Sequence, residues 1–265
     1  MKKRLFGSGH LEKYRKEWML VAVFALEFII CGVLSPSDFL SWRNMQSLAF
    51  QIPEIGIISL AMMVVIITGG INLSIATCAA LSSIIAAYTL SGLNGSGLSD
   101  WVIIIFSIIV AILSASICGL FNGAVVAYVG VSPILVTIGT MTLFQGIGLY
   151  FTHGKAISGF NESFYVFGNE KFAGIPISMI IFAVIAFVTW ILLEKTPWGL
   201  YIHMLGCNRR ATEFSGVNVK KALLKAYILS SIIGSIAAII MMSRYNSAKV
   251  DYGSSYLMLS ITATV

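Results

Sequence analysis

The segment GGINLS, residues 69–74, places polar groups and glycines inside an otherwise apolar region. Gly69 and Gly70 lack side chains, which helps where helices turn or approach each other closely. Asn72 and Ser74 can form hydrogen bonds with carbonyls and amides that a turn inside a membrane leaves without partners. Two interpretations fit these residues equally well: a lining for the path of a polar solute, or a tight packing joint between helices.

A second group of polar residues follows in 119–140. Pro133, in VGVSPILVTIGT, fits the first turn of a helix, where its missing amide is not needed. Asn122, in GLFNG, falls inside an apolar stretch, where a buried amide more often forms an interhelical hydrogen bond than binds a ligand. Together with Thr137, these residues are candidates for a helix break that lines a path.

The titratable residues do not form a catalytic or metal-binding pattern. Glu27 lies halfway along the first apolar run, but a proton relay would require other acids or histidines at the same depth. The three histidines are terminal or lie in loops, and the four cysteines lack metal-ligand spacing. We therefore expect no catalytic residue and no metal site, and we expect Glu27 to face other helices in a structural role.

The composition is that of an integral membrane protein. The 265 residues are 58% hydrophobic and only 11% charged, with a mean hydropathy of +0.91. Soluble domains carry about 25% charged residues. The basic residues lie beside the apolar runs, where orientation in the bilayer explains them better than binding of nucleic acid.

The apolar runs predict an all-α, polytopic transmembrane bundle with interrupted helices. Crossing a hydrocarbon core of about 30 Å requires about 20 helical residues. Five runs fit, at 18–34, 101–128, 133–152, 174–194 and 222–242. The run 52–91 is twice too long, so we predict two spans that meet near Gly69–Asn72. With an eighth span that starts near Ser255 and is incomplete, residues 1–265 form a single membrane domain.

The basic residues support this division of 52–91, because it places most of them on one side. Twelve share the side of the N-terminus: Lys2, Lys3, Arg4, Lys13, Arg15, Lys16, Lys195, Arg209, Arg210, Lys220, Lys221 and Lys225. Five lie opposite: Arg43, Lys155, Lys171, Arg244 and Lys249. Cytoplasmic loops carry the excess of Lys and Arg. Residues 1–17 and 195–221 are thus predicted to be cytoplasmic, and the segments 35–50, 91–100, 153–173 and 243–254 to face outward.

The predicted cytoplasmic segment 195–221 is longer than a connection between two spans requires. Within it, Ala211–Phe214 predicts a short helix that ends near Gly216, a residue suited to a left-handed cap. Both a solvated surface loop and a helix that docks a partner protein fit this pattern.

Three segments resemble one transporter family. GGINLSIATCAAL is similar to GGIDLSVGSVMAL of the ribose/xylose-type permeases of ATP-binding cassette (ABC) transporters, within the branched-chain/ribose permease superfamily. GLFNG with VSPILVTIGTM resembles their G-x-x-N-G followed by VPPFIxTLGTM. TPWGLYIHMLGCNRRATEFSGVNV resembles TxFGRxIYAIGGNxxAARxSGINV. The matching segments occur in order from about residue 45 to the end of the chain.

The resemblance implies a transport subunit rather than an enzyme. It implies a path for a sugar or sugar-like solute in the inner (cytoplasmic) membrane, formed in lipid with an identical or related second permease chain. A cytoplasmic ABC ATPase would use ATP and Mg, and an extracytoplasmic solute-binding protein would deliver the solute. The chain has no Gly-x-x-x-x-Gly-Lys-Ser/Thr loop, which fits ATP hydrolysis in a separate chain, and we expect it to bind no cofactor itself.

The resemblance also assigns two sets of residues by position. The helix break or translocation path is expected at Gly69, Gly70, Asn72, Ser74, Asn122, Pro133 and Thr137. ATPase coupling is expected at Gly206, Asn208, Arg209, Arg210, Ala211, Glu213 and Gly216, within the coupling loop 195–221.

The sequence departs from the family pattern at several positions. Asn72 replaces the family's aspartate and Ala76 its following glycine, while Arg209 and Arg210 stand where acidic residues are common. Family chains continue beyond Val265, so this chain is expected to be incomplete relative to them. A nucleoside or branched-chain amino-acid ABC permease remains open as an alternative, as does a self-sufficient channel or secondary carrier.

Overall fold

The computed structural model describes residues 15–264, so the predictions for residues 1–14 lie outside the described part of the chain. The chain divides into two compact units, one that ends at Ala49 and one that begins at Phe50. Helix α4 (Trp42–Ile66) contains the boundary between them.

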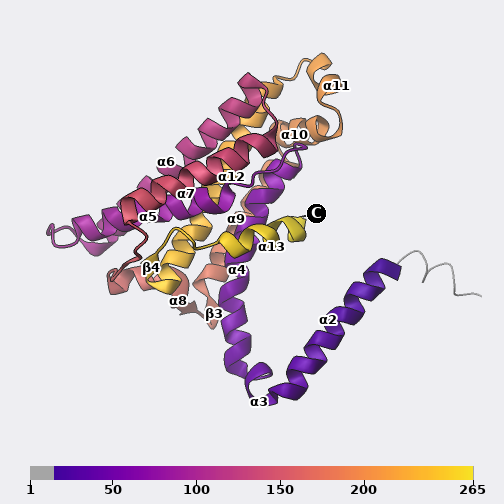
Figure 1. The fold of residues 1–265 in the computed structure, drawn as a ribbon. Helices are drawn as coiled ribbons and strands as arrows, with labels where there is room; N and C mark the ends of the chain where they lie inside the picture. Colours follow the sequence, from indigo (N-terminus) through magenta and orange to yellow (C-terminus); the bar gives the residue numbers. More distant parts are fainter. Residues whose placement is uncertain (1–14, 265) are drawn as a thin grey trace, which may run out of the picture. The chain divides into compact units, whose positions relative to one another are not determined.

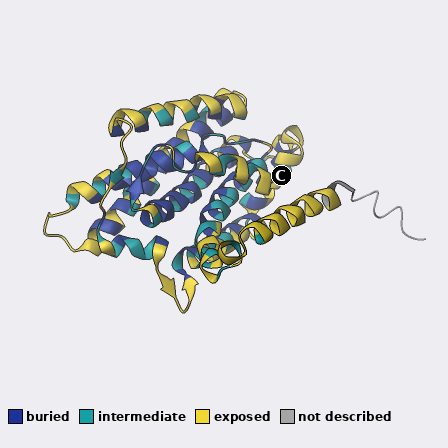
Figure 2. Ribbon diagram, turned by 60° about the horizontal axis from the view of Figure 1, so that its bottom comes forward, coloured by how far each residue is buried: buried dark blue, intermediate teal, exposed yellow. Residues whose placement is uncertain are grey.

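The first unit contains α2 (Arg15–Leu34), the short α3 (Pro36–Phe39) and the first turns of α4. The rings of Phe28 and Phe39 meet edge to face with centroids 5.0 Å apart. Figure 2 shows α2 exposed over nearly all of Trp18–Leu34, as expected for an apolar helix that faces lipid or another protein. Glu27 is also exposed, so this unit does not provide the helix-facing environment that we expected for its carboxylate.

The second unit is a helical bundle (Figure 1). Its long helices are the rest of α4, α5 (Ile75–Leu93), α6 (Asp100–Ala124), α7 (Pro133–Thr152), α9 (Ile177–Glu194) and α12 (Val219–Tyr245). Helix α12 packs against both α5 and α6, and α5 also packs against α7. Because α5 and α12 are surrounded in this way, most of their residues are buried.

Shorter elements connect these helices. They are the π-helix η1 (Val125–Val129), η2 (Glu162–Tyr165), α8 (Val166–Asn169), α10 (Pro197–Cys207), α11 (Arg209–Phe214) and α13 (Ser254–Thr264). Four two-residue strands form two antiparallel pairs: β1 (Ile157–Ser158) with β4 (Ser247–Ala248), and β2 (Lys171–Phe172) with β3 (Ile175–Pro176). The predicted all-α fold class is confirmed, because these short strands only pair connecting segments with one another.

Within the described residues, six helices are long and apolar enough to cross a membrane. They are α4, α5, α6 with η1, α7, α9 and α12, and the apolar part of α2, Trp18–Leu34, is shorter. The predicted division of 52–91 is confirmed, because α4 ends at Ile66 and α5 begins at Ile75. The first of these two spans begins earlier than the predicted residue 52, because α4 begins at Trp42. A search by hydropathy misses its first turns, since they are polar.

The connections between the long helices gather at two opposite ends of the bundle. At one end, the α4–α5 turn, the α6–α7 break and the α10–α11 junction line a common cavity. At the other end, Asn161 donates a hydrogen bond to Asp100 over 2.8 Å, and β1 pairs with β4. This is the alternation that the charge distribution predicts. We call these the coupling-loop end and the strand end.

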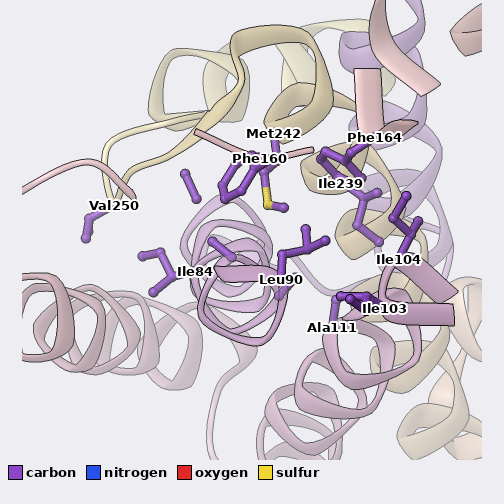
Figure 3. Close-up of a cluster of buried hydrophobic side chains, with 13 residues drawn as sticks. Ile84, Leu90, Ile103, Ile104, Ala111, Phe160, Phe164, Ile239, Met242 and Val250 are labelled. Atoms are coloured by element: carbon purple, nitrogen blue, oxygen red, sulfur yellow. The ribbon is translucent and has the colours of Figure 1, made fainter. Parts of the chain in front are cut away.

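The core at the strand end explains why the segment 153–173 is ordered. Phe160 and Phe164 from this segment point toward Ile84 and Leu90 of α5 and toward Met242 of α12 (Figure 3). The Ser243 hydroxyl donates to the Phe164 carbonyl over 2.6 Å and accepts from the Gly168 amide over 2.9 Å. The aromatic residues of this segment therefore close this end of the bundle.

Candidate functional site

The GGINLS segment forms a turn at the coupling-loop end. After α4 ends at Ile66, Gly69 adopts a left-handed conformation with φ of 81°, which a glycine tolerates without strain. A Cβ atom on Gly70 would lie 3.1 Å from the Tyr227 hydroxyl and 3.4 Å from Pro133, so no larger residue fits there without displacement. The two glycines therefore allow a tight turn that lies against α12 and the start of α7.

A buried hydrogen-bond network begins directly after this turn. Asn122 donates to the Ser74 hydroxyl over 2.7 Å, and Ser74 donates to the Asn72 side-chain oxygen over 2.8 Å. The Asn72 amide reaches Ser230 of α12 at the longer distance of 3.5 Å. All four residues are buried. The network joins the turn to α6 and α12, and it includes the interhelical hydrogen bond that we expected for Asn122.

The GLFNG motif explains how Asn122 comes so close to the turn. A Cβ atom on Gly119 would lie 2.7 Å from the Ser231 hydroxyl, and one on Gly123 would lie 3.1 Å from the Cα of Leu224. The two glycines let the backbones of α6 and α12 approach closely, as small residues do in membrane bundles. Asn122 lies between them and reaches across to Ser74.

The second predicted break, between α6 and α7, has an unusual geometry. Helix α6 ends in the π-helical turn η1, and Gly130 then adopts a left-handed conformation with φ of 83°. Such π-helical turns are frequent at functional sites. Pro133 is the first residue of α7, as predicted. Thr137, one turn later, donates to the carbonyl of its own helix at Pro133 over 2.8 Å and lies 3.3 Å from the Ile71 carbonyl.

The seven residues predicted to form the helix break thus come together. Gly69, Gly70, Asn72 and Ser74 lie on the turn, and Asn122, Pro133 and Thr137 contact it or its network. Buried oxygen atoms without a hydrogen-bond partner lie nearby, among them Asn122 Oδ1 and the Tyr227 hydroxyl. The site can therefore offer neutral amide and hydroxyl groups to a polar molecule.

The segment 195–221 folds into two helices rather than one. Helix α10 was not predicted, although its apolar side chains Ile202 and Leu205 are buried. The predicted short helix is present as α11, and the Asn208 side chain caps it by accepting from the Ala211 amide over 3.1 Å. Gly216 has a φ of 81°, so the left-handed cap predicted at this residue is confirmed.

A cavity of about 300 Å³ connects the two predicted sets of residues. The turn and the α6–α7 break line it on one side, through residues such as Gly69 and Pro133. The end of α10 and the start of α11 line it on the other, through Gly206, Asn208 and Arg209. Members of both predicted sets therefore line one cavity.

Helix α11 presents an exposed apolar side chain that the sequence analysis did not single out. Phe214 is 92% exposed, whereas Thr212 is buried against the bundle. Arg209, Arg210 and Glu213 are also exposed. Exposed apolar residues on the long helices can face lipid, but α11 is not one of those helices. Phe214 is thus a candidate contact for another protein.

A buried ion pair at the strand end was also missed. Arg244 Nη1 of α12 lies 3.2 Å from Glu54 Oε1 of α4, and the carboxylate is fully buried. Tyr256 of α13 donates to Glu54 Oε2 over 3.1 Å, and Arg244 donates to the Tyr245 hydroxyl over 2.7 Å. Arg244 had been placed on the outer side, but its pairing with Glu54 was not predicted.

These features define an α-helical, multi-pass membrane protein with a polar site beside an ordered loop. Within residues 15–264, no group of three or more His, Cys, Asp or Glu could hold a metal ion. Residues 44–265 match the model of the family described as "Branched-chain amino acid transport system / permease component". The chain belongs to this family, and is a permease subunit of the inner membrane that works with other components of an ABC importer.

The chain is also similar to permease proteins of the autoinducer 2 import systems of several bacteria. The autoinducer 2 import system permease protein LsrD of Salmonella paratyphi A is 32% identical over 262 residues, which cover 96% of this chain and 75% of the relative. LsrD of Klebsiella pneumoniae is 30% identical with the same coverage. LsrD of Yersinia enterocolitica is 32% identical over 96% of this chain and 76% of the relative. No solved structure matches the chain.

Proposed function

We propose that this permease forms the membrane path for a small, uncharged, sugar-like solute in an ATP-driven importer. Its relatives are named for import of autoinducer 2, which is a sugar-like molecule. The observation that carries the proposal is the buried network of Asn72, Ser74, Asn122 and Ser230, which contains only neutral amides and hydroxyls. Such groups suit the hydroxyls of a sugar and offer no charge to an amino acid.

The solute class can be tested by uptake. Vesicles that contain the permease with its ATPase and solute-binding protein should accumulate labelled autoinducer 2 or a pentose when ATP is supplied. Labelled leucine serves as the matched amino-acid solute. Accumulation of leucine alone would contradict the proposal, and accumulation without ATP would favour a channel or secondary carrier.

The proposed assembly has a second permease chain, identical or related, an ATPase on the cytoplasmic side and an extracytoplasmic binding protein. Helix α11 is the proposed docking element for the ATPase. It is capped at both ends, by Asn208 and by the left-handed Gly216, so it can transmit a displacement that a flexible loop would absorb. Arg209 and Arg210 can pair with carboxylates of the ATPase, and Phe214 can enter an apolar pocket.

Phe214 is expected to be the principal anchor of this docking. Exposed aromatic residues commonly dominate interfaces, and truncation of such a residue costs about 2 kcal/mol or more. The variant Phe214→Ala should then weaken ATPase binding by roughly 30-fold or more. Phe172→Ala is the matched control, because Phe172 is 71% exposed on the β2–β3 hairpin at the strand end. Equal ATPase binding by both variants, measured by co-purification, would exclude Phe214 as the anchor.

Two variants, one on α11 and one at its cap, should uncouple the importer. Ala211→Asp places a carboxylate on the exposed side of α11, and Gly216→Pro is incompatible with the observed φ of 81° because proline fixes φ near −65°. Both should release the ATPase or leave ATP hydrolysis without uptake, while the permease still inserts. If both variants keep ATPase binding and full uptake, coupling does not use α11.

The proposed topology places the N-terminus and the coupling-loop end in the cytoplasm. Ser96 and Ser158 lie at the strand end and Ser215 follows α11, and all three are exposed. In a background where the exposed Cys31 and Cys207 are replaced by serine, Ser96→Cys and Ser158→Cys should react with an impermeant thiol reagent in intact cells. Labelling of Ser215→Cys with protection of the other two would show that the topology is the reverse of the one proposed.

A further inference from the structure

The end of α10 meets the end of α4 through backbone atoms. Gly206 is the second-to-last residue of α10, and a Cβ atom at this position would collide with the Ile67 carbonyl oxygen. A Cβ atom on Gly69 would lie 3.8 Å from the Gly206 Cα. The neighbouring Leu205 packs in one apolar cluster with Met63 and Ile67, which holds α10 against this end of α4. Gly206 thus gives the two backbones direct contact.

This contact lies between the exposed helix α11 and the buried polar network. On the α11 side, Asn208 ends α10 and caps α11, and its carbonyl accepts from the Thr212 hydroxyl over 2.9 Å. On the other side, the chain continues from Ile67 through the turn to Asn72 and Ser74. The path from α11 to the network is therefore short and made of capped helix ends and backbone contacts.

We propose that the contact of Gly206 with Ile67 is the joint that carries a displacement of α11 to the Asn72–Ser74–Asn122 network. Gly206 is then a positioning residue inside the permease and not a contact for the ATPase. This inference rests on the proposed docking of the ATPase at α11. Backbone atoms have no alternative rotamers, and packed contacts have low compressibility, so a movement of α10 moves the turn.

The variant Gly206→Ala tests the joint, since its methyl group must push α10 away from Ile67. The ATPase should still bind, because α11 is unchanged, but the ratio of solute imported to ATP hydrolysed should fall at least about fivefold, the lower range of coupling between sites. Gly92→Ala is the matched control. Gly92 is also the second-to-last residue of its helix, α5, and a Cβ there would meet nothing within 4 Å.

A second measurement uses the unaltered protein, and decides the question if Gly206→Ala does not fold. Hydrogen exchange of the complex is compared between its nucleotide-free state and its ATP–vanadate-trapped state. We expect exchange to change in peptides that cover 205–216 and also in those that cover 68–74. A change confined to 205–216 would overturn the joint while leaving ATPase docking intact.

The outcomes separate the joint from the proposed function. If wild-type permease binds no ATPase, the docking proposal fails and the joint fails with it. If wild type binds the ATPase and Gly206→Ala retains the wild-type ratio of import to hydrolysis, only the joint is wrong. Loss of that ratio in Gly206→Ala, with normal behaviour of Gly92→Ala, supports both.

Discussion

Replacing Glu54 with alanine is expected to destabilise the bundle by about 3–5 kcal/mol, because it leaves a charged partner buried without compensation. Arg244 has a side chain only 16% exposed, and its guanidinium lies 3.2 Å from the carboxylate. Tyr256 also loses its acceptor. Unfolding of the purified protein in mixed micelles, followed as dodecyl sulfate is added, measures the loss.

Two further variants test whether the loss of stability comes from the charge left unpaired and from the burial of the ion pair. In Glu54→Leu/Arg244→Met both charges are removed, and this double variant should be more stable than Glu54→Ala, since apolar replacement of a whole buried pair is often tolerated. Asp251→Asn breaks the exposed pair with Lys249, in which the side chains are 42% and 60% exposed, and should change stability by about 1 kcal/mol or less. A similar loss in Asp251→Asn and Glu54→Ala would show that burial is not the cause.

Replacing Asn72 with leucine is expected to reduce solute uptake by about tenfold or more, the factor that corresponds to roughly 1.4 kcal/mol. Leucine cannot accept the hydrogen bond from Ser74 or donate to Ser230, so buried hydroxyls lose their partners. Membrane insertion should persist, because leucine is favourable in a span. The measurement is ATP-dependent uptake, normalised to the amount of inserted permease.

The ribose/xylose-type permeases carry an aspartate at this position. The variant Asn72→Asp is therefore the control that keeps the shape of the side chain. Asn72→Asp keeps an oxygen that accepts from Ser74, so it should retain more uptake than Asn72→Leu. Asn94→Leu makes the same change at an exposed residue just after α5, and should leave uptake unchanged. If Asn72→Leu transports as well as wild type, the network serves packing alone.

The long helices could be predicted because hydropathy and length determine them directly. The division at Gly69–Asn72 also followed from the distribution of Lys and Arg, without knowledge of any contact. The first turns of α4 and the helix α10 were not predicted. Both contain polar or short apolar segments, and their helical structure depends on neighbours such as the cluster around Leu205.

The candidate site could be predicted only in part. The sequence indicated Asn72, Ser74 and Asn122 because polar residues inside apolar runs require partners. Their partner Ser230 and the nearby Tyr227 lie in α12, and serines or tyrosines within a span are too common to be singled out. The approach of Gly206 to Ile67 depends on how two distant helix ends meet, which no local pattern of residues determines.

Helices α4, α5 and α6 are synthesised well before α12, which carries partners for buried polar side chains of α4 and of the turn that follows it. Glu54 is paired by Arg244, and Asn72 contacts Ser230, which is 158 positions later in the chain. At about 5–20 residues per second, a ribosome needs roughly 10 to 40 s to proceed from Glu54 to Arg244. During that interval α4, α5 and α6 enter the bilayer with unpaired polar groups. The nascent chain must therefore be sheltered by the insertion machinery, or by temporary contacts among its first helices, until its central helix is made.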